Sequence, residues 1–113
     1  MDGTEILIVA DGFDVRYRRT GPAKHSRFRW TDVDEIVAFI VDLGTFDTIR
    51  LGIRSRVGDQ YVELDEDWTG FNQFVENIER RFDISHEWWS SVALPAFATN
   101  LVTLWPKSPG NVK

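Results

Sequence analysis

Hydrophobic and polar residues alternate along much of the first two thirds of the chain with the two-residue period of a β-strand. Phe13, Val15 and Tyr17 alternate with charged residues, which places all three on one face of a strand. Further alternating or apolar stretches of strand length cover residues 5–10, 27–30, 49–54 and 61–65. Turn-forming pairs that contain glycine lie between several of these stretches. The pattern predicts a meander of short antiparallel strands over residues 1–66.

Residues 34–43 are compatible with either a buried strand or a helix, because they form an almost continuous apolar run. Their β-branched and aromatic content favours a strand. Residues 31–34, which lead into this stretch, are typical of a short helical turn rather than the start of a long helix. We therefore expect a strand here.

A helix is predicted between residues 67 and 83. Five apolar residues fall at i, i+3, i+4, i+7 and i+11, which gives one stripe along a helix from Thr69 to Phe82; they are Phe71, Phe74, Val75, Ile78 and Phe82. Either Asp67 or Thr69 is suited to cap its N-terminus. Six strands followed by one helix predict an α+β fold, in which an antiparallel six-stranded sheet or partial barrel is closed by this amphipathic helix.

The segment from Trp88 to Pro106 contains no charged residue and three of the five tryptophans. Pro95 divides it, so we expect a short helix over residues 85–93, then a second element that is helical or, over residues 101–105, extended. Residues 84–106 are interpreted as a helical or extended cover on the core, and residues 107–113 as a flexible tail. The alternative is an interface for a partner or a second copy. Its candidate residues are Trp88, Trp89, Phe97 and Trp105.

Composition bounds the class of protein. A length of 113 residues with 42% hydrophobic and 27% charged residues indicates a single globular domain over residues 1–113. The uncharged segment contains five Ser, Thr or Asn residues and has no flanking Lys or Arg cluster, so no membrane span is expected. The absence of cysteine and of a basic, apolar leader favours a cytoplasmic location.

The net charge of −5 is spread unevenly. Residues 1–31 hold six basic residues against four acidic ones, whereas residues 32–113 hold seven against fourteen. This balance argues against nucleic acid, which requires a continuous basic face. Strand alternation nevertheless gathers several arginines on one sheet face, where ion pairs with Glu63 and Asp65 are the favoured explanation. The alternative is a shallow anion-binding patch made of Arg16, Arg18, Arg27 and Arg29.

Candidate chemistry is sparse. His86 and Ser90 have helical i, i+4 spacing, but a nucleophilic site also needs an orienting group and an oxyanion pocket. His25 and His86 are the only imidazoles and lack paired-ligand spacing, so no metal and no other cofactor is predicted. The acidic residues 63–67 lack the ligand spacing of a calcium loop.

Two stretches resemble a known kind of domain. Residues 30–36, a strand that ends in Trp and leads through an acidic turn into a new strand, resemble small bacterial domains of the pleckstrin-homology-like kind, together with residues 47–51 and the amphipathic helix. The string from Trp88 to Asn100 is similar to uncharacterised bacterial proteins of about this length. The resemblance implies a binding scaffold and brings no catalytic residues.

The sequence thus predicts a non-enzymatic module that binds a protein partner or ligand, or that associates with itself as a homodimer. A more specific alternative is an acidic immunity-type protein that neutralises a basic toxin. An alternative of a different class is a small hydrolase, which a cleft combining His86, Ser90 and an acidic residue would support.

Overall fold

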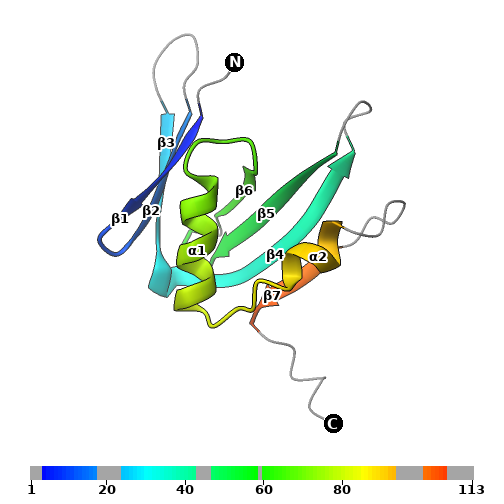
Figure 1. Cartoon of the computed structure of the whole chain (residues 1–113). Helices are drawn as coiled ribbons and strands as arrows, with labels where there is room; N and C mark the ends of the chain where they lie inside the picture. The colour runs from blue at the N-terminus through cyan, green and yellow to red at the C-terminus, as the bar shows by residue number, and fades with distance from the viewer. Residues whose placement is uncertain (1–3, 18–23, 43–46, 59, 94–100, 107–113) are drawn as a thin grey trace.

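The strands form two antiparallel sheets in the computed structural model, which describes residues 4–17, 24–42, 47–58, 60–93 and 101–106. The first sheet has the order β1-β2-β3, and its strands are β1 (Glu5–Val9), β2 (Gly12–Tyr17) and β3 (Lys24–Arg29). The second has the order β6-β5-β4-β7, and its strands are β4 (Val33–Asp42), β5 (Asp47–Ser55), β6 (Tyr61–Asp65) and β7 (Val102–Trp105). Figure 1 shows the two sheets as separate units of one molecule.

The two sheets correct the predicted architecture. A single six-stranded sheet or partial barrel closed by a helix is wrong, because β3 does not pair with β4 and the described residues form a three-stranded and a four-stranded sheet. A short 3-10 helix, η1 (Trp30–Asp32), lies between these strands. At η1 the Trp30 N–H donates to the Asp11 carbonyl over 2.9 Å. The chain thus leaves the first sheet before β4 starts the second.

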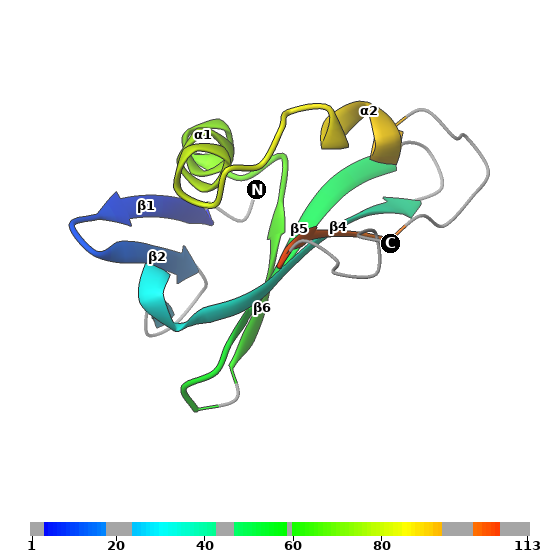
Figure 2. The ribbon, with the colours of Figure 1, turned by 90° about the horizontal axis from the view of Figure 1, so that it is seen from below.

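Two α-helices are present in the described part of the chain, α1 (Phe71–Arg81) and α2 (Trp88–Ala93). Figure 2 shows both on the same side of the sheets, with α1 near the first sheet and α2 over the second. None of the described helices is long and apolar enough to cross a membrane. Instead of closing a barrel, α1 contributes its apolar stripe to a core shared by both sheets.

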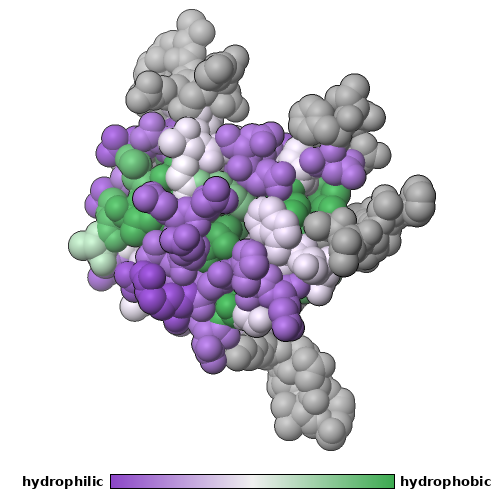
Figure 3. All heavy atoms as spheres, in the orientation of Figure 1, coloured by the Kyte–Doolittle hydropathy of each residue, from purple (hydrophilic) through white to green (hydrophobic). Residues whose placement is uncertain are grey.

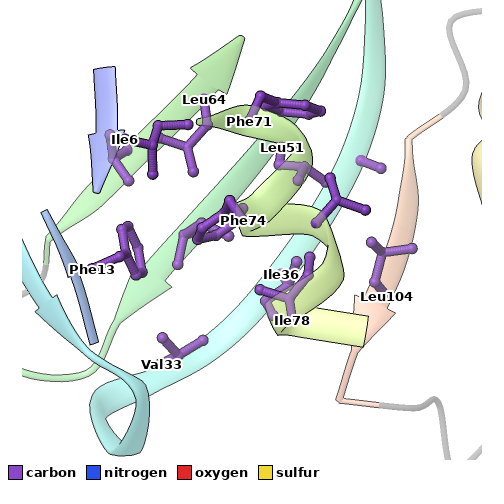
Figure 4. Packing of buried hydrophobic residues seen from close by; sticks show 14 of the residues in the cluster. Ile6, Phe13, Val33, Ile36, Leu51, Leu64, Phe71, Phe74, Ile78 and Leu104 are labelled. Carbon is purple, nitrogen blue, oxygen red and sulfur yellow. The ribbon is translucent and has the colours of Figure 1, made fainter. Parts of the chain in front are cut away.

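The core sits where α1 meets the two sheets (Figure 4). Phe74 is fully buried and packs edge-on against Phe13 of β2, with ring centroids 4.8 Å apart. Phe13 in turn stacks on Phe28 of β3. On the second sheet the same cluster includes Ile36 of β4 and Leu51 of β5. Burying such side chains is the main favourable contribution to folding, at about 1.5–3 kcal/mol each.

Other local predictions have mixed outcomes. The strand expected over residues 34–43 is confirmed as β4. The expected caps of α1, Asp67 or Thr69, are wrong: the N-cap is Gly70 in a left-handed conformation, and no side chain caps the helix. Beyond α2, the extended alternative is the observed one, because β7 adds to the second sheet next to β4.

Candidate functional site

A hollow of about 470 Å³ lies between α1 and the segment that carries α2. Four of its residues come from α1 at i, i+3, i+4 and i+7, so they form one side of that helix. The lining residues are Asn72, Val75, Glu76, Glu79, His86 and Trp89. Figure 3 shows the face that carries both helices, where strongly hydrophilic surface adjoins paler and hydrophobic surface. The hollow therefore combines carboxylates with aromatic and apolar groups.

A sharp reversal after α1 brings His86 back to the helix. Asp83 adopts a left-handed backbone with φ of 56°, and the Ile84 N–H donates to the carbonyl of Glu79 over 2.9 Å. Ser85 then accepts the Glu87 N–H on its Oγ at 3.2 Å, so it stabilises the start of the next helical segment. This turn places His86 and α2 beside the exposed end of α1.

Glu79 holds the two segments together. Its Oε2 accepts a hydrogen bond from the Trp88 Nε1 over 2.8 Å and lies 2.6 Å from the His86 Nδ1. The Glu79 side chain is only 18% exposed, whereas that of His86 is 66% exposed. One carboxylate thus fixes a buried indole and orients an imidazole that remains open to solvent.

The tryptophans predicted as an interaction surface have different environments. Trp88 is buried, so it belongs to the core rather than to the surface. Trp89 is half-buried in the hollow, where the His86 ring stacks on it at 6.0 Å between centroids and 20° between planes. Trp105 is half-buried against Phe82. Phe97 lies outside the described residues.

The hydrolase interpretation relied on His86 and Ser90, and the structure gives His86 a different partner. The His86 imidazole pairs with Glu79, and Ser90 does not line the hollow. Among the described residues that line it, none carries a hydroxyl or thiol. The pairing was missed because Glu79 and His86 lie on opposite sides of the turn at Asp83, where helical spacing does not apply.

The predicted anion patch faces carboxylates of the same sheet. Asp14 is almost fully buried, receives two hydrogen bonds from Arg27 at 2.8 and 3.1 Å, and lies 3.9 Å from Arg16. The Asp14 hydrogen bond raises the pKa of the Arg27 guanidinium. Arg29 pairs with Asp11 at 3.5 Å. Arg18 lies outside the described residues, and the predicted partners Glu63 and Asp65 pair with Arg50 of β5.

A second hollow, of about 510 Å³, lies between β1 and the N-terminal turn of α1. It contains Glu66, whose Oε1 is buried and has no hydrogen-bond partner among the described residues. Burial raises the pKa of Glu66, and the nearby charges of Asp67 and Asp65 add to this effect, whereas a hydrogen bond with the backbone of Ile49 opposes it. The neutral acid is therefore favoured in the native state more than in the unfolded chain.

We expect Glu66→Gln to stabilise the protein at pH 7 by less than about 1 kcal/mol, since Glu66 is only partly buried. Because the folded pKa exceeds the unfolded one, wild-type stability falls as the pH rises through these two values. The glutamine variant lacks this loss, so its advantage should disappear below about pH 3.5, where the carboxyl is neutral in both states. Urea denaturation of the wild type and the variant, at pH 7 and below about pH 3.5, measures the difference in their free energy of unfolding. An advantage of equal size at both would contradict the role of the charge.

Among the described residues, no group of three or more His, Cys, Asp or Glu side chains is placed to hold a metal ion. Comparisons with protein-family models, curated proteins and solved structures found no match to this chain. The hollow between α1 and α2 is therefore interpreted from its own geometry.

Proposed function

We propose that this protein is a non-enzymatic protein-interaction module whose docking site is the hollow between α1 and α2. The observation that supports this most is the lining of the hollow: a half-buried indole and an exposed imidazole beside two carboxylates, with no hydroxyl or thiol among its described residues. Such a set can recognise a group but lacks a hydroxyl or thiol nucleophile for covalent catalysis.

The rigidity of the hollow supports a binding role. Glu79 bridges Trp88 and His86, and Phe71 packs edge-on against Trp89 with centroids 6.4 Å apart. A preorganised aromatic surface loses little conformational entropy when a partner binds. Tryptophan is also enriched among the residues that contribute most to binding energy. The volume of the hollow suits one or two side chains of a partner rather than a large cofactor.

The hydrolase alternative would use Glu79 and His86 as an oriented acid–base pair that activates water. The pair has suitable geometry, with 2.6 Å between the Glu79 Oε2 and the His86 Nδ1. The hollow, however, has no Lys or Arg among its described lining residues to stabilise an oxyanion, and His86 is already paired with Glu79. Binding is therefore the better supported of the two functions.

Site-specific photo-crosslinking tests the docking site. A photoreactive phenylalanine at Asn72, an exposed residue of the hollow, is expected to give one discrete adduct in the native cell. The same group at Gln60, exposed between β5 and β6, serves as the control and should not give that adduct. An adduct between two copies of this chain would show that the protein binds to itself. Identical products from both positions would contradict the proposal.

The captured protein must then bind the purified chain in a defined assay. We expect Trp89→Ala to weaken binding by about tenfold or more, as for an aromatic residue at the centre of an interface. Tyr61→Ala is the matched control, because Tyr61 is 52% exposed and lies on β6, outside the hollow. Equal affinities of the two variants, measured by calorimetry on folded protein, would exclude the hollow as the docking site.

A further inference from the structure

We infer that the hollow between α1 and α2 accepts a basic side chain, lysine or arginine, presented by a protein partner. This inference rests on the proposed function and specifies the chemistry of the partner. Three observations support it: the carboxylates of the hollow are not neutralised by a described Lys or Arg, apolar side chains lie beside them, and the neighbouring arginines of α1 point to other partners.

The charge of the hollow is negative and is not neutralised by a neighbouring cation. Glu76 and Glu79 line it, and no described Lys or Arg does. Glu76 is exposed, and no ion pair to it is observed among the described residues. Among the described residues that line the hollow, only His86 can carry a positive charge, and it is already paired with Glu79. At least the Glu76 carboxylate is therefore available to a ligand.

The arginines of α1 are held away from this side of the helix. Arg80 donates a hydrogen bond to the Asn77 Oδ1 over 3.1 Å. The Arg81 guanidinium lies over the Trp30 ring, 5.0 Å from its centroid, on the side of the core. Neither residue lines the hollow. The end of α1 thus carries two cations, yet both are directed to other partners.

The apolar groups of the hollow match the stem of a long basic side chain. Val75 and Trp89 lie beside the two carboxylates, so methylene groups can pack on them while the charged head reaches Glu76. An indole also attracts a cation through its ring face. A short ammonium ion would leave the apolar groups uncovered, and an apolar residue would bury the Glu76 carboxylate without a partner.

The charge of the rest of the chain acts in the same direction. The hollow belongs to residues 32–113, which hold seven basic residues against fourteen acidic ones. A field of this sign accelerates the approach of a basic protein and disfavours an acidic one. The predicted immunity-type role, in which an acidic protein neutralises a basic toxin, would use this kind of contact.

Titration of the ¹⁵N-labelled chain with four capped tripeptides tests the inference. The peptides are acetyl-Gly-X-Gly-amide, where X is Arg, Lys, Gln or Glu. We expect saturable shifts at the Trp89 indole N–H and at the Glu76 and His86 amides with Arg and Lys, with affinities about tenfold or more above that of the Gln peptide. Binding should weaken as salt is added.

Glu76→Lys is expected to weaken binding of the Arg peptide about tenfold. Glu87→Lys is the matched control, since it makes the same change in net charge at an exposed residue outside the hollow and should alter affinity less than about twofold. Equal binding of the Gln and Arg peptides would contradict the preference for a basic side chain, but it would not contradict the docking site. The preference for a basic side chain would also be contradicted if Glu76→Lys and Glu87→Lys had equal effects, or if the shifts lay outside the hollow. The absence of any shift with every peptide at about 10 mM would contradict it as well. The docking site itself is tested separately, by the crosslinking experiment and by the calorimetry of Trp89→Ala.

Discussion

Deletion of residues 84–113 is expected to prevent folding. The described part of the deleted segment contributes three buried side chains to the core: Trp88, Val92 and Leu104 are 5%, 0% and 6% exposed. At about 1.5–3 kcal/mol for each buried side chain, their loss approaches the 5–15 kcal/mol by which a typical domain is stable. The deletion also removes β7, which pairs with β4. Circular dichroism and the dispersion of the amide proton spectrum would show an unfolded chain.

Point variants in β7 and at the residue before it distinguish the loss of core packing from the effect of shortening the chain. Leu104→Ala should lower the free energy of unfolding by about 2–5 kcal/mol, because Leu104 is buried. Leu101→Ala, at a residue that is 61% exposed, should change it by less than about 0.5 kcal/mol. A folded deletion variant, or equal costs for the two leucines, would show that this segment does not form part of the core.

The sequence predicted local structure better than the arrangement of the elements. Period-two alternation identifies which residues share one face of a strand, as for Phe13 and Val15, which are both buried. It does not identify which strands are neighbours. The separation into two sheets depends on η1, where Trp30 bonds back to Asp11, and on pairing between β4 and β7, which are distant in sequence. The four residues of β7 are too few to show an alternating pattern from which its pairing with β4 could be predicted.

The candidate site was predicted in part for a related reason. Trp89 was among the predicted interaction residues, because tryptophan density in an uncharged segment is visible in sequence. Its neighbours Glu76 and Glu79 were not, since they occupy the polar side of an amphipathic helix and are there indistinguishable from solvated residues. What makes them part of a site is the left-handed turn at Asp83, which returns the chain along that side of α1. Aspartate adopts this conformation more often than most residues, so Asp83 was the available signal.

Gly70→Ala is expected to destabilise the protein by about 3 kcal/mol or more. Gly70 has φ of 91°, which is unfavourable for any residue with a Cβ. An added Cβ would also overlap the carbonyl oxygen of Ile6, which is a backbone atom and cannot rotate away. Gly58→Ala is the matched control: φ is 70° there, and the nearest atom, 3.7 Å from the added Cβ, belongs to the flexible side chain of Gln60. We expect it to cost about 1 kcal/mol in urea denaturation.

A third variant distinguishes backbone strain from overlap with β1. Asparagine tolerates the left-handed conformation better than alanine, so Gly70→Asn would recover most of the loss if strain alone were responsible. Overlap with Ile6 predicts no recovery, because asparagine also has a Cβ. The Ile6 N–H donates to the Thr69 carbonyl over 2.8 Å, so β1 and the start of α1 meet at this point. If Gly70→Ala proved no more costly than Gly58→Ala, this contact would not fix α1. The position of α1 determines where Asn72, Val75 and Glu76 face α2, and the contact at Gly70 therefore also sets the geometry of the hollow.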